Sequence, residues 1–316
     1  LSYSLAKKGI DSTIWHRDKN IVSLMQKSRV HYLIQNLNFP KNVFFSNNIS
    51  ESIKIADIII LAIPSQCIRE IILVNKNYFS ENQILVNVSK GIENDSLMTV
   101  SDVIIDELGC SYKKIVTLSG PSHAEEVIEL NPTTLVSSSK DLVSAKKVQS
   151  VFSSDFLRIY INKDILGVEL GGAIKNVIAI ASGICDGIGY GDNTKAALLT
   201  RGISEIGNLG TLMGAKSSTF QGLSGIGDLI VTALSKHSRN RKVGEQIGKG
   251  KSLNLILKKM NMVAEGVKSS ISVNELRKKH NADMPICESV YNILFNKKDP
   301  KQAVYELMNR ELKIEN

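Results

Sequence analysis

The stretch Asp57–Ile63 reads DIIILAI, a run of apolar residues that follows a single aspartate. A strand with one face in water alternates apolar and polar residues, whereas a strand covered by helices on both faces is apolar throughout. Pro64 follows directly and cannot continue a strand ladder. The stretch therefore predicts a buried strand in a mainly parallel sheet.

Outward from this strand, the first half of the chain alternates short β-branched runs with helical patterns such as Ser96–Leu108 and Asp141–Phe152. The alternation predicts an α/β domain with a doubly wound, Rossmann-like sheet. Ligands of such sheets bind at the carboxyl ends of the strands. The other strands are predicted at Ser12–His16, Val43–Phe45, Ile84–Ser89, Ile115–Leu118, Thr134–Ser137 and Leu157–Ile161.

After about Asp164 the strand signals stop and helical periodicity takes over. We predict an all-α second domain, with the nucleotide-binding domain at residues 1–163 and the substrate and catalytic domain at residues 164–316. The helices are predicted at Ile165–Ile184, Asn193–Met213, Asn240–Ile247, Leu253–Met260, Glu265–Lys279, Ile286–Phe295 and Lys301–Asn309.

The bulk composition is that of a soluble globular protein, with 43% hydrophobic and 22% charged residues over 316 positions. The longest apolar run, Ala173–Ile184, is interrupted by Lys175 and Asn176 and falls short of the roughly 18–20 residues that span a bilayer. No basic segment followed by an apolar one opens the sequence, so we expect no signal segment. The 4 cysteines are scattered without a C-x-x-C pair, so we expect no metal site and free thiols in a reducing, cytoplasmic compartment.

The formal net charge is +8. Nucleic-acid binding is one explanation, but aromatic residues make up only 5% and the Lys and Arg residues are spread along the chain. A small anionic substrate explains the charge equally well.

Two segments follow predicted strands in the first half. In TIWHRD, Thr13–Asp18, the residues after the strand would meet the ribose of a dinucleotide, where an acid selects NAD and an arginine accepts the 2′-phosphate of NADP. His16 and Arg17 with Asp18 leave both cofactors open, and a simple surface loop is the alternative. In VSKG, Val88–Gly91, Lys90 points either into the ligand crevice or into water.

SGPSHAEE, Ser119–Glu126, follows a further strand. Gly120 makes a turn, and Ser122 with Glu125 matches a capping box at a helix start. The segment is either an anion or carbonyl site or only a cap.

The strongest single feature is GGAIKNVIAIASG, Gly171–Gly183. Burying an ammonium group is costly, so a lysine inside such an apolar helix is unusual. A buried lysine has a lowered pKa and can exchange protons near neutral pH. The alternative is that Lys175 snorkels to the edge of the helix.

GLSGIGD, Gly222–Asp228, is predicted to be a glycine-rich loop in which Asp228 orients Lys175, binds a substrate hydroxyl or only begins a helix. In SRNRK, Ser238 is a helix cap, but Arg239 and Arg241 oppose the helix dipole. A bound phosphate would offset this charge, whereas a solvated basic turn would not explain it. VAEG, Val263–Gly266, says little alone.

Taken in order, VSKG, SGPSHAEE, the long stretch Gly171–Ile206, GLSGIGDLIVT, SRNR and VAEG resemble the bacterial type of NAD(P)-dependent glycerol-3-phosphate dehydrogenase. The resemblance implies reduction of dihydroxyacetone phosphate to sn-glycerol 3-phosphate with NAD or NADP as cofactor, in phospholipid synthesis. It also implies a homodimer.

The resemblance assigns Lys175 as the proton donor and acceptor. It implies substrate contacts by Lys90, Gly120, Ser122, Lys175, Asp228, Ser238, Arg239 and Asn240. It implies cofactor contacts by His16, Arg17, Lys90, Ala124, Arg239, Val263 and Glu265.

One departure concerns the start of the chain. The family begins with a strand and a G-x-G-x-W-G turn, whereas residues 1–9 here read as the end of a helix with Gly9 as its C-cap. We therefore expect the first strand and the pyrophosphate-binding turn to be missing, with a gap in the sheet and weak cofactor binding. The alternatives are a ketopantoate reductase or hydroxyacyl-CoA dehydrogenase of the same plan, or a truncated, inactive nucleotide-binding relic.

Overall fold

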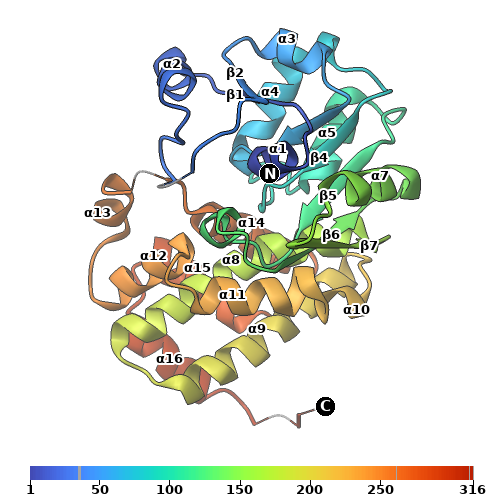
Figure 1. Cartoon of the computed structure of the whole chain (residues 1–316). Coiled ribbons are helices and arrows are strands. Elements are labelled where there is room, and N and C mark those ends of the chain that lie inside the picture. Colours follow the sequence, from blue (N-terminus) through green and yellow to red (C-terminus); the bar gives the residue numbers. More distant parts are fainter. Residues whose placement is uncertain (35–36, 261, 313, 316) are drawn as a thin grey trace. The chain divides into compact units, whose positions relative to one another are not determined.

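The computed structural model describes residues 1–34, 37–260, 262–312 and 314–315. The chain divides into two compact units, most of whose helices and strands are labelled in Figure 1. The first unit consists of Leu1–Ile63, Cys67–Val88 and Ser101–Ile165, and the second of Pro64–Gln66, Ser89–Val100 and Leu166–Asn316. Two short segments from the first half of the sequence therefore belong to the second unit.

The first unit is an α/β structure, and each predicted strand is found within two residues of its expected bounds. β1 pairs with β2 in parallel, and a second ladder has the order β3-β4-β5-β6-β7. Only the β5–β6 pair of these ladders is antiparallel. The strands are β1 Ser12–Trp15, β2 Val43–Ser46, β3 Ile58–Leu61, β4 Ile84–Asn87, β5 Ile115–Ser119, β6 Thr133–Ser138 and β7 Leu157–Asn162.

The strand β3, which contains most of the apolar run Asp57–Ile63, is less buried than predicted. Ile58, Ile59 and Ile60 are half-buried, whereas β4 and β5 are buried along their whole length. The reason is that β3 is the edge strand of its ladder, so it has a neighbouring strand on one side only. The prediction of a strand covered throughout is therefore wrong for β3, whose ladder is separate from the β1–β2 pair.

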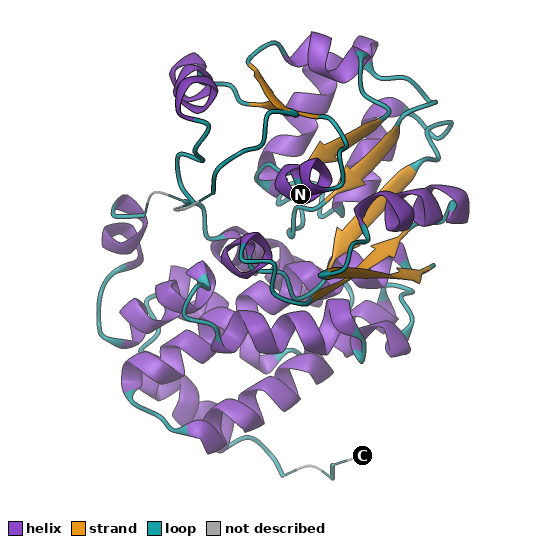
Figure 2. Ribbon diagram, viewed as in Figure 1, coloured by secondary structure: helices purple, strands orange, loops and turns teal. Residues whose placement is uncertain are grey.

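The helices of the first unit surround these strands (Figure 2). They are α1 Ser2–Lys7, α2 Lys19–Ser28, α3 Ile49–Lys54, α4 Ile68–Asn75, α5 Val100–Leu108, α6 Ala124–Ile128 and α7 Leu142–Phe152, with the 3₁₀ turn η2 Lys76–Tyr78. The 3₁₀ turn η1, Ser65–Cys67, begins in the second unit with Ser65 and Gln66. Gly9 follows α1 with φ +74°, a left-handed conformation that suits glycine at a helix end.

The capping box predicted at α6 is wrong. The N-cap of α6 is His123, and no side chain there accepts a capping hydrogen bond. Ser122 Oγ instead donates to the carbonyl oxygen of Gly120 at 3.1 Å. The hydroxyl closes the turn after β5 because Gly120, at φ +141°, bends the chain back toward it.

The second unit is helical in its described residues, as predicted. It contains α8 Ile165–Ile188, α9 Asp192–Leu212, α10 Ser217–Phe220, α11 Asp228–Leu234, α12 Arg239–Gly248, α13 Leu253–Lys258, α14 Glu265–Lys279, α15 Pro285–Phe295 and α16 Pro300–Met308. α8 supplies much of the core, from Leu170 to Ile184. It is long and apolar enough to cross a membrane, but its apolar window is 94% buried, which is the state of a core helix.

Glycines bring α8 and α12 into backbone contact. A Cβ atom on Gly183 would lie 1.9 Å from the carbonyl oxygen of Arg241, and one on Gly244 would lie 2.0 Å from that of Ile180. Gly187 and Gly248 repeat this contact one turn further along. Only helices without side chains at these positions can pack so closely.

The segment predicted as a glycine-rich loop is a π-helix, Leu223–Gly227 (η3), that continues directly into α11. A Cβ on Gly171 would lie 2.7 Å from the carbonyl oxygen of Ser224, so glycine on α8 makes room for this turn. Single π-helical turns are rare in proteins, and those that occur often lie at functional sites.

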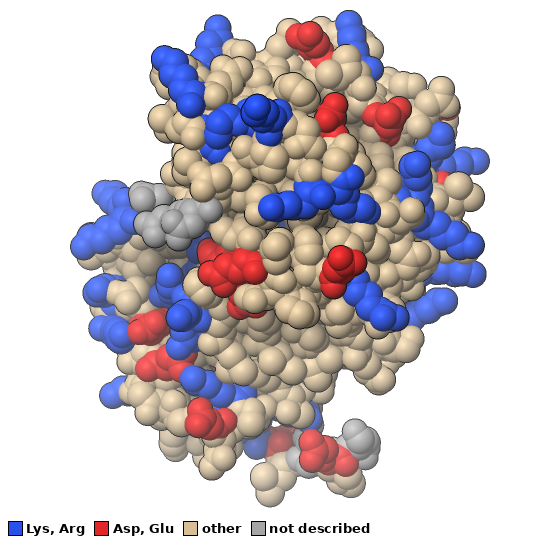
Figure 3. Space-filling view, viewed as in Figure 1, with Lys and Arg blue, Asp and Glu red and all other residues tan. Residues whose placement is uncertain are grey.

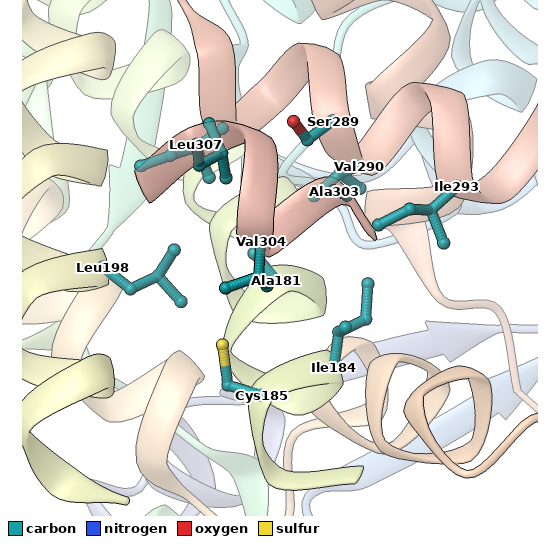
Figure 4. A pocket seen from close by; sticks show the side chains of 11 residues that line it. Ala181, Ile184, Cys185, Leu198, Ser289, Val290, Ile293, Ala303, Val304 and Leu307 are labelled. Atoms are coloured by element: carbon teal, nitrogen blue, oxygen red, sulfur yellow. The ribbon is translucent and has the colours of Figure 1, made fainter. Parts of the chain in front are cut away.

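An apolar cavity lies among α8, α9, α15 and α16 (Figure 4). Apart from Ser289 and Cys185, its lining is aliphatic, and it holds no charged side chain. It is therefore a space within the packing of the helices. The lining residues are Ala181, Ile184, Cys185, Leu198, Ile286, Ser289, Val290, Ile293, Ala303, Val304 and Leu307.

Candidate active site

The second unit places two lysines on one buried carboxylate. Asp228, the first residue of α11, accepts from Lys175 Nζ through Oδ1 at 2.5 Å and from Lys90 Nζ through Oδ2 at 2.6 Å. Thr232, one turn along α11, accepts a further bond from Lys175 at 2.5 Å. Asp228 is 1% and Lys175 4% exposed, whereas 22% of the Lys90 side chain reaches the surface. The alternative that Lys175 snorkels to the edge of the helix is thus excluded, and the prediction of a buried lysine is confirmed.

The electrostatics of this cluster suit proton transfer. Burial lowers the pKa of Lys175 to about 7, and Lys90 acts in the same direction, while Asp228 only partly opposes them. Burial alone would raise the pKa of Asp228, but the two ammonium groups outweigh it and hold that pKa below its usual value. Lys175 can therefore exchange a proton near neutral pH beside a carboxylate that stays ionised.

A chain of amide hydrogen bonds connects the segments around Lys175. Asn176 Nδ2 donates to the carbonyl oxygen of Lys90 at 3.2 Å, and Asn176 Oδ1 accepts from Asn240 Nδ2 at 2.8 Å. Asn240 Oδ1 then accepts from the backbone of Gly266 at 2.9 Å. The Lys90 segment, α8, α12 and the start of α14 are therefore held together next to the lysines. Asn240 was predicted at the substrate, yet both ends of its side chain bond within the protein.

Sequence analysis missed Asn176 as a member of this chain. Its position beside Lys175 in an apolar helix was the available signal, because a buried carboxamide needs partners as much as a buried ammonium does. The partners themselves are distant in sequence and could not be read from it.

Of the two arginines predicted at the start of α12, only Arg239 is exposed to solvent. Ser238 is the N-cap and its Oγ accepts from the Arg241 backbone at 3.2 Å. Arg241 pairs with Asp186 at 2.6 Å, which explains a cation at this end of the helix without a ligand. Arg239 is exposed and donates to the carbonyl oxygen of Val263 at 2.9 Å. An anion at the helix start would therefore meet Arg239 and not Arg241.

Glu265 begins α14, and its carboxylate is held by a residue that sequence analysis missed. Oε1 accepts from the Ser65 backbone at 3.0 Å and Oε2 accepts from Ser65 Oγ at 2.8 Å. No local pattern links these two residues, which are 200 positions apart.

The remaining predicted site residues lie in the first unit. At the carboxyl end of β1, His16 Nδ1 accepts from the Asp18 backbone at 3.0 Å, and the His16 ring lies edge-on to Tyr32 with centroids 5.4 Å apart. Arg17 is exposed, and Asp18 caps α2 by accepting from the backbone of Asn20. Tyr32 was missed, because an aromatic residue beyond a helix carries no spacing signal.

Gly120, Ser122 and Ala124 follow the carboxyl end of β5. A Cβ on Gly120 would lie 3.1 Å from the Thr134 carbonyl oxygen, so the turn requires glycine. A guanidinium and an imidazole after β1, with a tight turn after β5, fit a dinucleotide along the carboxyl ends of the strands. Among the described residues, no group of three or more His, Cys, Asp or Glu could hold a metal ion.

A Rossmann-like unit with basic residues after β1, together with a helical unit that buries a lysine on a carboxylate, defines an NAD(P)-dependent dehydrogenase of the two-domain type. Residues 1–145 match the family model described as NAD-dependent glycerol-3-phosphate dehydrogenase N-terminus, and residues 164–305 match the corresponding C-terminus. The chain belongs to the NAD-dependent glycerol-3-phosphate dehydrogenase family.

Individual proteins that resemble this chain carry the name of the same family. Glycerol-3-phosphate dehydrogenase [NAD(P)+] of Clostridium botulinum is 48% identical over 100% of this chain and 95% of its own length. The crystal structure of glycerol-3-phosphate dehydrogenase from Coxiella burnetii matches with a TM-score of 0.93 and 33% identity, over 98% of this chain and 95% of that one. A ketopantoate reductase from Ralstonia eutropha, at 11% identity and a TM-score of 0.59 over 96% and 95% of the two chains, shares the fold alone.

Proposed function

We propose that this chain interconverts dihydroxyacetone phosphate and sn-glycerol 3-phosphate with NAD or NADP. The observation that carries the proposal is the buried cluster of Lys175, Asp228 and Lys90. Reduction of a ketone leaves negative charge on its oxygen, and a desolvated ammonium group with a pKa near 7 can both stabilise that charge and release a proton to it.

The residues of the proposed site have separate roles in the reaction. Lys175 holds the proton that the carbonyl oxygen receives, Asp228 keeps the lysine in place, and Lys90 adds positive charge at the surface side of the cluster. Arg239 would bind the phosphate at the helix start that Ser238 and Asn240 hold in place, and would so fix the carbonyl group relative to Lys175. Gly120 and Ser122 would line the substrate from the turn after β5. When bound, the nicotinamide supplies the hydride.

The proposed cofactor contacts begin after β1. His16 and Arg17 would contact the ribose, where the arginine would accept the 2′-phosphate of NADP and Asp18 leaves NAD open. Ala124, Val263, Glu265, Lys90 and Arg239 complete the proposed contacts. The proposal includes domains at residues 1–163 and 164–316, which rest on the change from strand to helix patterns after Asp164. It includes a cytoplasmic location, which rests on the scattered free cysteines. A role in glycerophospholipid synthesis and a homodimer rest on the family resemblance.

The test is steady-state oxidation of NADH and NADPH with dihydroxyacetone phosphate, for wild type, Lys175→Met and the exposed control Lys258→Met. We expect Lys175→Met to bind substrate but to lose kcat by about 100-fold or more, the usual share of a general acid. Lys258→Met should stay within about twofold of wild type, because surface changes are usually neutral. Equal rates for wild type and Lys175→Met, or a preference for ketopantoate or hydroxyacyl-CoA substrates, would contradict the proposal.

A further inference from the structure

Ser65 donates hydrogen bonds to both oxygens of one carboxylate. Its backbone N–H and its hydroxyl donate to the two oxygens of Glu265, at 3.0 and 2.8 Å. Ser65 is only 3% exposed, so water does not compete for this hydroxyl. Two bonds from one residue set both the position and the rotation of the carboxylate at the start of α14.

The side chains of Ser65 and Glu265 pack closely against the backbone at Gly91. A Cβ on Gly91 would lie 2.1 Å from Ser65 Oγ and 3.1 Å from Glu265 Oε2. Glycine directly after Lys90 is therefore needed because the Ser65 and Glu265 side chains occupy the space beside it. This contact explains the glycine of the VSKG motif, which sequence analysis did not.

The neighbouring side chain holds the Lys90 segment in turn. Gln66 Nε2 donates to the Ile92 carbonyl oxygen at 2.7 Å, and Gln66 Oε1 accepts from the Asn94 backbone at 3.1 Å. The dipeptide Ser65–Gln66 thus fixes the two segments that carry Glu265 and Lys90.

We propose that Ser65 is a positioning residue, which holds the Glu265 carboxylate in the orientation that NADH or NADPH binds. The inference rests on the proposed function, which makes Glu265 a cofactor contact. A carboxylate fixed before binding loses less conformational freedom when the cofactor arrives, so its orientation contributes to affinity. Ser65 itself needs no contact with the cofactor.

The experiment compares Ser65→Ala, Glu265→Gln and the double variant by titration of NADH fluorescence, which requires no turnover. Ser65→Ala removes the hydroxyl bond and keeps the backbone one, and we expect the Kd for NADH to rise about tenfold, as loss of one hydrogen bond to a charged group would predict. The KM for dihydroxyacetone phosphate and kcat at saturating cofactor should change by less than about twofold. If Ser65 acts through Glu265, the double variant should bind no more weakly than Glu265→Gln alone.

Ser270→Ala is the matched control. Ser270 is a buried serine of α14, 1% exposed, whose hydroxyl donates to the Val267 carbonyl oxygen of the same helix at 2.8 Å. It should leave the Kd for NADH unchanged, even if the Tm of the unliganded protein falls. Unchanged NADH affinity in Ser65→Ala, additive losses in the double variant, or equal losses of affinity in Ser65→Ala and Ser270→Ala would overturn the proposal. A wild-type protein that binds NADH but does not reduce dihydroxyacetone phosphate would refute the proposed function and leave this test intact.

Discussion

At the scale of single residues, the chemistry of Lys175 depends on what replaces water around it. One carboxylate oxygen and one hydroxyl take the place of its solvation shell, while Lys90 shares the same carboxylate. Two ammonium groups on one carboxylate leave an excess positive charge in a buried place. Burial is the largest cause that lowers the pKa of Lys175, and the excess positive charge from Lys90 adds to it.

The pKa of Lys175 predicts opposite pH dependences for the two directions of the reaction. Because burial lowers this pKa to about 7, the ammonium form is lost as pH rises through neutrality. Reduction needs the ammonium form, so its kcat/KM should fall above a pH of about 7, whereas oxidation needs the neutral amine and should rise over the same range. Initial rates between pH 5.5 and pH 9 would check this, with roughly tenfold per unit at the limiting slopes. Parallel profiles in the two directions would count against Lys175.

At the scale of elements, the site depends on how closely α8 and α12 approach. α8 carries Lys175 and α12 begins with Arg239, and the glycine contacts at Gly183 and Gly244 set the distance between the two helix axes. The π-helix η3 sets Asp228 against α8 through the similar contact at Gly171. Small residues far from the chemistry therefore position the groups that perform it.

Gly244→Ala tests this dependence. The added Cβ would meet the Ile180 carbonyl oxygen at 2.0 Å, so α12 must move away from α8. We expect a loss of about 1–3 kcal/mol in the free energy of unfolding, which is typical of overpacking, and a higher KM for dihydroxyacetone phosphate because Arg239 moves with its helix. Urea denaturation and steady-state kinetics measure the two effects.

Gly191→Ala is the control for that substitution. Gly191 has no atom within 4 Å of the added Cβ and no left-handed φ. Both stability and KM should stay near the wild-type values. If Gly244→Ala behaves in the same way as Gly191→Ala, the close contact does not position α12.

At the scale of the whole molecule, the net charge of +8 acts on anionic substrates. The face in Figure 3 shows Lys and Arg in many places with Asp and Glu between them, rather than one continuous basic stripe. Such a surface suits weak, general attraction of a small anion better than tracking of a nucleic-acid backbone.

This attraction predicts a salt dependence. The kcat/KM for dihydroxyacetone phosphate should fall several-fold between roughly 0.01 and 0.2 M NaCl, because the Debye length shortens over this range. The uncharged analogue dihydroxyacetone should react far more slowly and with little dependence on salt. A salt effect of equal size for both compounds would show that the charge on the substrate is not its cause.

The sequence by itself determined the class of the fold and one central residue of the site. Strand and helix periodicity placed the strands and most of the long helices, because these patterns are local and repeat with the geometry of each element. The same reasoning identified Lys175, since a lysine within an apolar helix is conspicuous without knowledge of its neighbours.

Only the tertiary structure decided which side chains of the site pair with one another. Asp228 meets Lys175 across 53 positions and Ser65 meets Glu265 across 200, and which carboxylate finds which donor depends on how helices pack. The same holds for the edge position of β3 and for the π-helix in place of a loop, which follow from neighbouring elements and not from local preference. Periodicity records which face of an element is buried, whereas the identity of what covers that face is a property of the folded chain.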